Sequence, residues 1–213
     1  MRSAYLNVLG FETWRRRSIV VPEGLDARGS LDWSALRIDA LSCVRCPACA
    51  TRTQAVFSQA NLTAQWLLVG DVPDVVEDRQ GEPFVGDAGT LLSAMLGAIG
   101  LSRNQVYMTH VQKCRAAIAN PTMSALVECL PFLDRQVQLL APKIMLVMGE
   151  SAAQGLLHSE KSLDELRQQV HAFGELRIPL IATYHPAHLL RTPADKRKAW
   201  EDLKFAREVF AGG

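Results

Sequence analysis

Five cysteines are the residues of this sequence whose types and spacing point most directly to chemistry. Cys43, Cys46 and Cys49 crowd into the segment CVRCPAC, and Cys114 and Cys129 follow later in the chain. In a reducing compartment such crowding favours metal ligation over disulfide bonds. If four of the five thiols bind a metal, one cysteine is left over.

Three further segments combine glycine or proline turns with polar or aromatic groups. They are residues 70–89 (GDVPDVVEDRQGEPFVGDAG), 109–114 (THVQKC) and 184–193 (YHPAHLLRTP). Each follows an apolar run that predicts a buried strand, and parallel sheets bind their ligands beyond the carboxyl ends of the strands. Any one of these loops could be an ordinary strand–helix turn, because glycine and proline punctuate such turns. Three loops converging on one edge favour a functional site there.

The elements that must position these loops alternate between short apolar runs and amphipathic helices. We expect strands over residues 64–69, 106–111, 143–148 and 178–183. We expect helices over residues 90–99, 124–140 and 194–210, and one more that follows the third strand and runs to about residue 157. Apolar strands separated by helices indicate a parallel sheet that is covered on both faces. The predicted fold class is therefore α/β, a three-layer αβα sandwich with a mostly parallel central sheet.

Length and composition narrow the classes of protein further. The chain has 213 residues, enough for one domain with a sizeable core, and 48% of them are hydrophobic. Lys and Arg total 23 against 22 Asp and Glu, which excludes a strongly basic nucleic-acid coat and an acidic disordered tail. No apolar run approaches the roughly 18 residues of a membrane span, and residues 1–17 lack the apolar stretch of a signal peptide. We therefore expect a cytoplasmic protein.

Three longer motifs are shared with a known enzyme family. The sequence contains EDxxGxPFVGxAG at residues 77–89, VYxTxVxKCR at residues 106–115 and HPAxLLRxP at residues 185–193. Over residues 43–205 the chain resembles the family-4 (iron–sulfur) uracil-DNA glycosylases, and the three motifs together are more specific than any one alone. The resemblance implies a uracil-DNA glycosylase-like fold, a [4Fe–4S] cluster, DNA as partner, and excision of uracil or another deaminated base.

The resemblance also assigns the cysteines. The ligand positions of the family match Cys43, Cys46, Cys114 and Cys129, whereas Cys49 falls where the family needs no cysteine and is interpreted as spare. Four thiolates suit an iron–sulfur cluster, which would tie the N-terminal segment to the loop after the second strand. The same four residues could hold a tetrahedral zinc ion, and their spacing does not separate the two metals. Buried cysteines without a ligand role are a weaker alternative.

A base pocket within the three loops follows from the same resemblance. Asp71 matches a carboxylate that organises water, and His185 matches the residue that stabilises negative charge on the departing uracil, so both are predicted to be catalytic. Gly70, Phe84 and His110 match substrate-binding positions, with Phe84 as the ring on which a flipped base stacks. Without the resemblance, Phe84 would be explained equally well as a core phenylalanine.

Arg191 is the predicted DNA-binding residue. It lies in the HPAxLLR motif, and Lys196, Arg197 and Lys198 follow it closely. Basic side chains in such a position could hold DNA phosphates. The solvated start of a helix explains these charges at least as well.

Three positions depart from the pattern of the family. Asp71 stands where the family has a glutamate, which is one methylene longer, and Asp74 replaces a glycine near the expected ligand. His110 replaces an asparagine whose amide offers uracil a donor and an acceptor side by side, and one imidazole ring does not present that pair. These departures leave open whether the chain is an active enzyme.

The N-terminal residues suggest a second class of function. Residues 5–17 (YLNVLGFETWRRR) are similar to the N-terminal peptide of the psi subunit of the bacterial DNA polymerase III clamp loader, whose αβα fold is related to uracil-DNA glycosylases. We expect residues 1–17 to form an interaction peptide, residues 18–40 a linker, and residues 41–213 the glycosylase-like domain. The anchors on clamp-loader subunits would be Leu6, Leu9, Phe11 and Trp14. Alternatively, these side chains pack on the surface of their own domain.

Two functions follow from these observations. In the first, the chain is a DNA glycosylase of DNA repair that hydrolyses the N-glycosidic bond of a deaminated base. In the second, it is a non-catalytic psi-like subunit of the clamp loader, built on a degenerate glycosylase scaffold. The motifs over residues 43–205 favour the enzyme, whereas the altered pocket positions and residues 5–17 favour the subunit.

Overall fold

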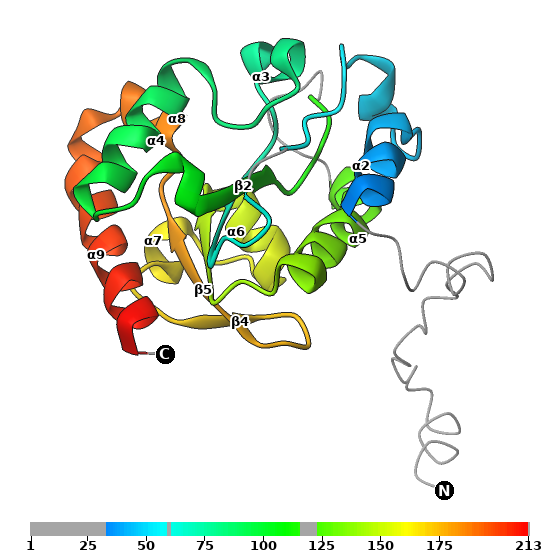
Figure 1. Cartoon of the computed structure of the whole chain (residues 1–213). Coiled ribbons are helices and arrows are strands. Elements are labelled where there is room, and N and C mark those ends of the chain that lie inside the picture. Colours follow the sequence, from blue (N-terminus) through cyan, green and yellow to red (C-terminus); the bar gives the residue numbers. More distant parts are fainter. Residues whose placement is uncertain (1–32, 59–60, 116–122, 213) are drawn as a thin grey trace, which may run out of the picture. The chain divides into compact units, whose positions relative to one another are not determined.

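A five-stranded sheet lies at the centre of the fold (Figure 1). The computed structural model describes residues 33–58, 61–115 and 123–212. The strands are β1 (Trp66–Gly70), β2 (Val106–His110), β3 (Ile144–Met148), β4 (His171–Phe173) and β5 (Ile178–Thr183), in the order β2-β1-β3-β5-β4. All pairs are parallel except β4 with β5. The four predicted strands are confirmed to within two residues, and the short antiparallel β4 was not predicted.

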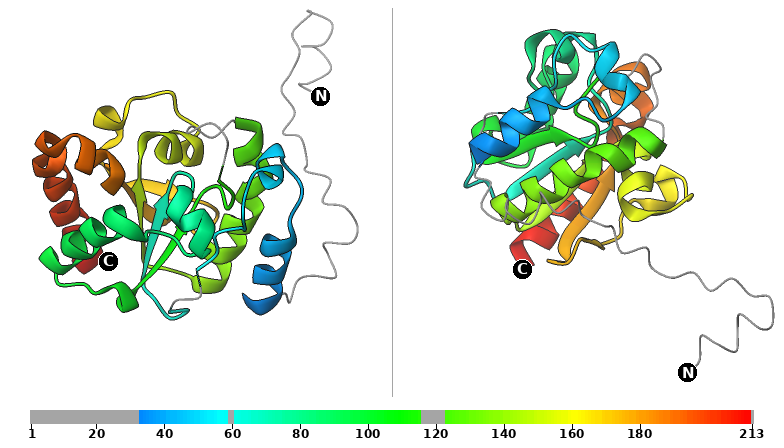
Figure 2. Two further views of the ribbon diagram at one scale, coloured as in Figure 1. Left: turned by 90° about the horizontal axis from the view of Figure 1, so that it is seen from above. Right: turned by 90° about the vertical axis from the view of Figure 1, so that its right-hand side faces the viewer.

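Helices cover both faces of the sheet, which confirms the three-layer αβα sandwich. Helices α4 (Gly86–Ala98) and α9 (Lys196–Gly212) lie on one face, and α5 (Met123–Leu140) and α6 (Glu150–Leu157) lie on the other (Figures 1 and 2). Every residue of β1, β2 and β3 is buried, because these strands are covered from both sides. In the described part of the chain, no helix is both long and apolar enough to cross a membrane.

A helix occupies the end of the segment that the sequence predicted to be a linker. Helix α2 (Trp33–Ser42) buries Leu36 and Ala40, and the Trp33 ring lies 5.0 Å from the Tyr107 ring of β2. The predicted linker over residues 18–40 is therefore wrong for residues 33–40, because their apolar side chains, four residues apart, pack on the domain. Residues 1–32, with the predicted interaction peptide, lie outside the described residues.

Short helices fill the loops between the strands and the longer helices. They are α3 (Val75–Gln80), α7 (Leu163–Leu166) and α8 (Pro186–Arg191), with 3-10 turns at Pro47–Ala50, Arg103–Gln105 and Pro193–Asp195. Asp74 begins α3 as its N-cap, since its carboxylate accepts hydrogen bonds from the backbone N–H groups of Val76 and Glu77. The Glu77 carboxylate accepts the N–H of Asp74 in return, which completes a capping box. The aspartate that departs from the family pattern thus starts a helix.

Candidate active site

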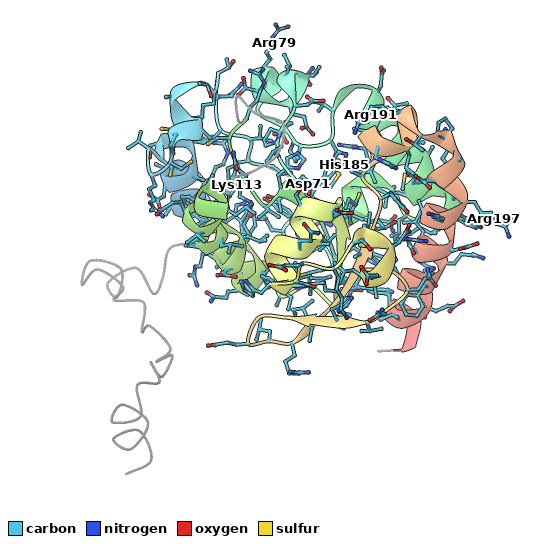
Figure 3. All side chains as sticks on the ribbon, turned by 180° about the vertical axis from the view of Figure 1, so that it is seen from behind. Asp71, Arg79, Lys113, His185, Arg191 and Arg197 are labelled. Carbon is cyan, nitrogen blue, oxygen red and sulfur yellow. The ribbon has the colours of Figure 1, made fainter. Side chains whose placement is uncertain are left out.

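A cleft of about 530 Å³ opens where β1, β3 and β5 end. Asp71 follows β1, Gly149 follows β3, and Tyr184 and His185 follow β5, and all four line the cleft together with Arg191 of α8. Figure 3 shows Asp71, His185 and Arg191 at the same end of the sheet. The loops after the first and fourth predicted strands therefore meet as the parallel topology requires.

His185 is held in one tautomer at this cleft. It is the N-cap of α8, and its Nδ1 accepts a hydrogen bond from the backbone N–H of Ala187 at 3.1 Å. The proton of the neutral ring therefore lies on Nε2, which is buried and has no hydrogen-bond partner among the described residues. Burial lowers the pKa of His185 to about 4. The side chain is consequently a neutral N–H donor to which the described part of the chain offers no acceptor.

Asp71 is anchored at the start of α6. Its Oδ1 accepts a hydrogen bond from the backbone N–H of Ala152 at 2.5 Å. Gly149 has a φ of +112°, and a Cβ built there would lie 2.0 Å from Oδ2 of Asp71, so only glycine leaves room for this carboxylate. Burial raises the pKa of Asp71 to about 6. The carboxylate is ionised at neutral pH and becomes protonated in mild acid.

Phe84, His110 and His185 form a cluster of three rings beside the cleft, which we name the ring cluster. The Phe84 ring lies 4.8 Å from the His110 ring and 5.6 Å from the His185 ring, centroid to centroid. Phe84 is 1% exposed and His110 is fully buried. The strand register sets His110 beside Gly70, where a Cβ would lie 2.5 Å from Nδ1 of His110 and 2.8 Å from Cζ of Phe84. The structure therefore brings Gly70, Phe84 and His110 together, but other residues line the cleft.

Glu77 holds the ring cluster together, although the sequence analysis gave it no role. Its Oε1 accepts a hydrogen bond from the backbone N–H of Phe84 and lies 3.0 Å from Nε2 of His110. Its Oε2 accepts the backbone N–H of Asp74 at 2.7 Å. Burial acts to raise the pKa of Glu77, but His110 and the backbone donors outweigh it and lower this pKa to about 2. Glu77 is thus a buried carboxylate ion that joins α3, the PFVG segment and β2.

The backbone of Phe84 depends on a glycine of α4. Phe84 has a φ of +54°, which non-glycine residues rarely adopt, and a Cβ at Gly89 would lie 1.9 Å from its carbonyl oxygen. We expect Gly89→Ala to lower the free energy of unfolding by about 2–3 kcal/mol. Gly97→Ala is the control in the same helix, because its Cβ would meet no described atom within 4 Å. It should raise stability by about 0.5–1 kcal/mol, and equal effects of the two substitutions in urea denaturation would contradict this packing.

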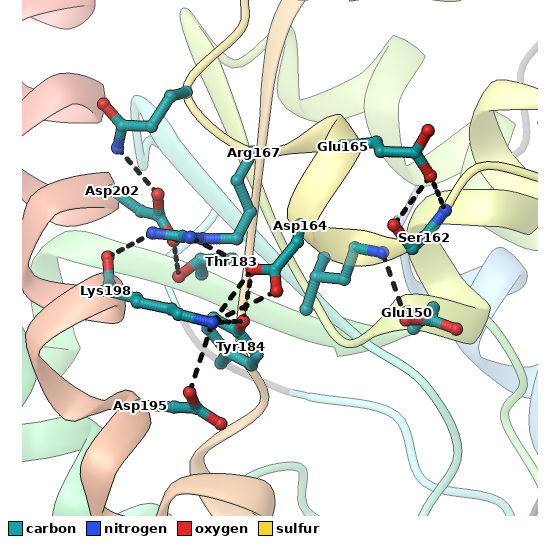
Figure 4. A network of polar contacts seen from close by, with 12 residues as sticks. Glu150, Ser162, Asp164, Glu165, Arg167, Thr183, Tyr184, Asp195, Lys198 and Asp202 are labelled. Atoms are coloured by element: carbon teal, nitrogen blue, oxygen red, sulfur yellow. Dashed lines mark hydrogen bonds and ion pairs between the residues drawn. The ribbon is translucent and has the colours of Figure 1, made fainter.

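A polar network fixes the end of β5, from which the histidine of the cleft follows (Figure 4). The Tyr184 hydroxyl donates to Oδ1 of Asp164 at 2.6 Å. The fully buried Asp202 of α9 accepts hydrogen bonds from Nε of Arg167 at 2.7 Å and from the Thr183 hydroxyl at 2.8 Å. Helices α7 and α9 therefore clamp this strand end, and a buried charged pair makes the clamp costly to break.

The four cysteines predicted as ligands come from three segments of the sequence, with Cys43 and Cys46 in the same one. Cys46 and Cys114 share a small buried cluster, and Nη1 of Arg52 donates to Sγ of Cys114 at 2.8 Å. Burial raises the pKa of Cys129 to about 11, and the nearby thiols of Cys114 and Cys46 raise it further. Four neighbouring thiols suit a thiolate-bound metal chemically. As placed in the described ranges, however, no three His, Cys, Asp or Glu side chains could hold a metal ion together.

Lys113 lies fully buried beside these cysteines. Its Nζ donates to Oγ1 of Thr109 at 2.8 Å and to Oε1 of Gln136 at 2.9 Å. Burial lowers the pKa of Lys113 to about 7. The bond to Gln136 ties the loop after β2 to α5.

Comparison with known proteins identifies the family of this fold and cleft. Residues 57–204, more than half of the chain, match the model of the uracil DNA glycosylase superfamily. The type-4 uracil-DNA glycosylase of Sulfurisphaera tokodaii is 34% identical over 182 residues, which cover 82% of this chain and 83% of that protein. The chain belongs to the type-4 uracil-DNA glycosylase family. The type-4 enzymes of Archaeoglobus fulgidus (34% identical, 79% and 88% covered) and Thermotoga maritima (32% identical, 79% and 89% covered) agree.

Membership of the type-4 uracil-DNA glycosylases confirms the resemblance inferred from the motifs. It gives no support to the similarity with the psi subunit of the clamp loader. The four anchors predicted for that partner lie outside the described residues: Leu6, Leu9, Phe11 and Trp14. The interaction peptide stays a sequence prediction.

Two arginines line the cleft of this member of the type-4 uracil-DNA glycosylase family. Arg191, the predicted DNA-binding residue, is exposed on α8 and lines the cleft. Arg115 also lines it, and the sequence analysis missed this role although Arg115 directly follows Cys114 in the KCR motif. Two guanidinium groups on one cleft favour phosphate oxygens as partners.

Proposed function

We propose that the chain is a DNA glycosylase of DNA repair that hydrolyses the N-glycosidic bond of uracil, or of another deaminated base, in DNA. The relatives named above are uracil-DNA glycosylases. The observation that carries the proposal is the neutral His185, whose buried Nε2–H has no acceptor among the described residues. Such a donor suits a reaction in which negative charge develops on an oxygen.

His185 would act on the leaving base. When the bond between C1′ and the base nitrogen breaks, its electron pair stays on the base, and negative charge spreads to the base oxygens. A donor that is already oriented stabilises this charge without reorganisation. The backbone N–H of Ala187 occupies Nδ1 and so fixes the tautomer that carries its proton on Nε2. Because the pKa of His185 is about 4, the ring stays neutral at physiological pH and donates a hydrogen bond.

Asp71 would act on the sugar and on the attacking water. An ionised carboxylate stabilises the positive charge that develops on the sugar as the base leaves, and it can orient the water that attacks C1′. The hydrogen bond from the N–H of Ala152 fixes the position of this carboxylate, which matters because the side chain is one methylene shorter than glutamate. Arg191 and Arg115 would hold the phosphates on either side of the flipped nucleotide.

The pH dependence of uracil excision tests this assignment. Because the pKa of Asp71 is about 6, we expect the single-turnover rate on a uracil-containing single-stranded oligonucleotide to fall about tenfold per pH unit below that value. His185 stays neutral down to a pH of about 4 and does not contribute to this fall of the rate, which we call the acidic limb. The Asp71→Asn variant should excise uracil slowly at every pH, and its rate should lack the acidic limb. A limb that persists in Asp71→Asn would show that another group carries it.

We also propose that Cys43, Cys46, Cys114 and Cys129 hold a [4Fe–4S] cluster. The resemblance in sequence and the four neighbouring thiols support this assignment. When bound, the cluster would cross-link the end of α2, the loop after β2 and helix α5. These residues would supply four thiolates, and Arg52 would donate a hydrogen bond to one of them.

Metal analysis of anaerobically purified protein tests the cluster. We expect about four iron and four sulfide ions per chain and a broad visible absorption band. Cys114→Ser should lose the band, because it removes a buried ligand. Cys49→Ser is the matched control and should keep it. A colourless protein with one zinc ion per chain would replace the cluster by the zinc alternative.

A further inference from the structure

The ring cluster leaves the face of Phe84 closed to a flipped base. Phe84 is 1% exposed, and the fully buried His110 ring packs against it at a centroid distance of 4.8 Å and an interplanar angle of 38°. The cleft is lined by Asp71 and His185 and by neither Phe84 nor His110. A base that enters the cleft of the free protein therefore does not reach the face of Phe84, against which the His185 ring also packs at a centroid distance of 5.6 Å.

His110 is held against Phe84 from two directions. Its Nε2 lies 3.0 Å from Oε1 of Glu77, and because this carboxylate is ionised, Nε2 donates its N–H. Its Nδ1 lies against Gly70, where a Cβ would be only 2.5 Å away, and has no hydrogen-bond partner in the described part of the chain. The ring therefore has one strong bond that keeps it in place, and moving it would cost the buried Glu77 carboxylate one of its three hydrogen-bond donors and leave it the backbone N–H groups of Asp74 and Phe84.

We propose that His110 is a specificity-determining residue that closes the base pocket by covering Phe84, so that a base stacks on Phe84 only when this imidazole gives way. The proposal rests on the proposed glycosylase site. It accounts for the difference between a cleft that is open at Asp71 and His185 and a ring that is buried next to them. A planar base and the imidazole compete for the same surface of Phe84. The wild-type protein should therefore excise uracil slowly and bind free uracil weakly.

Two substitutions separate the volume of the ring from its bond to Glu77. In His110→Asn the amide reaches only to the place of Nδ1, so the outer half of the ring is removed. In His110→Gln the amide reaches the place of Nε2 and keeps the bond to Glu77, but the chain is narrower than a ring. We expect His110→Asn to raise the single-turnover rate of uracil excision about tenfold or more over wild type. The excision rate of His110→Gln should lie between the rates of wild type and His110→Asn.

A control distinguishes an opened pocket from a loosened fold. Tyr107→Phe, on the same strand, removes a buried hydroxyl that bonds to Gln136 and to the carbonyl of Ser58, and it leaves the ring cluster intact. It should lower the melting temperature without raising excision. If Tyr107→Phe raised the excision rate as much as His110→Asn does, the proposal would be overturned.

Binding of free uracil, followed by ligand-observed NMR, supplies a readout that needs no catalysis. Tighter binding and faster excision by His110→Asn support the proposal. Equal rates and equal binding in wild type and His110→Asn overturn it, while excision itself upholds the glycosylase. If no variant excises but His110→Asn alone binds uracil, the proposed reaction fails and the closing role of His110 stands. If His110→Asn does not fold, His110→Gln decides: a gain in binding supports the proposal, and no gain overturns it.

Discussion

Replacement of His185 by Asn should lower the rate of uracil excision by about 10²–10³-fold and leave the fold intact, because it removes one oriented donor to the leaving base. Asn places an amide oxygen near the position of Nδ1, and Asn is a favoured N-cap, so the N–H of Ala187 keeps its acceptor. The Nε2–H donor has no counterpart in Asn. Single-turnover assays and thermal melts of the same preparations measure the two effects separately.

His185→Gln is the matched variant for this experiment. Its amide N–H reaches the position of Nε2, but the cap on α8 is lost, which costs about 1 kcal/mol. We therefore expect a less stable protein with more residual activity than His185→Asn. His158→Asn, which replaces a histidine in the left-handed conformation at the end of α6, should leave excision unchanged. Excision by His185→Asn at the wild-type rate would remove His185 from the mechanism.

Glu77→Gln should lower the free energy of unfolding by about 3 kcal/mol, although the two side chains have nearly the same size and shape. Glu77 accepts two backbone N–H groups and faces Nε2 of His110. An amide offers one oxygen to these donors and turns its own N–H₂ toward at least one of them. Because the pocket side chains lose their anchor, excision should fall together with stability.

The pH dependence of this loss identifies its cause. The folded-state pKa of Glu77, about 2, lies below the ordinary value of 4.5, so its contribution to stability is present above the ordinary value and disappears as the pH falls through about 2. Urea denaturation of wild type and Glu77→Gln should therefore show the full difference at neutral pH and a shrinking one in acid. Glu208→Gln, on an exposed part of α9, is the control and should stay within about 0.5 kcal/mol of wild type. A difference that stays constant in strong acid would point to packing instead of charge.

The strands and long helices could be predicted because their signal is local. The run IPLIAT is β5 at its predicted bounds, and Pro131 did not stop the predicted helix from continuing through α5. Helix α2 was missed because its sequence is weakly amphipathic, and its place depends on Leu36 and Ala40 meeting the domain. The three-residue β4 was missed because an edge strand of that length carries almost no pattern.

The site residues could be named from motifs, but their contacts could not. His185 and Asp71 line one cleft because parallel strands end at one edge, and the sequence indicates that much. The burial of His110, by contrast, follows from the register that sets it beside Gly70 and from the carboxylate of Glu77 across the fold. Arg115 reaches the cleft through the course of the loop after β2, which no local pattern encodes.

The release of free uracil tests the central claim most directly. Anaerobically purified protein would be incubated with a single-stranded oligonucleotide that contains one uracil, and the free base would be measured by chromatography beside His185→Asn. The account predicts that the wild-type protein releases uracil and leaves an abasic site, while His185→Asn releases about 10²–10³-fold less in the same time. A folded wild-type protein that binds this DNA and releases no uracil would contradict it.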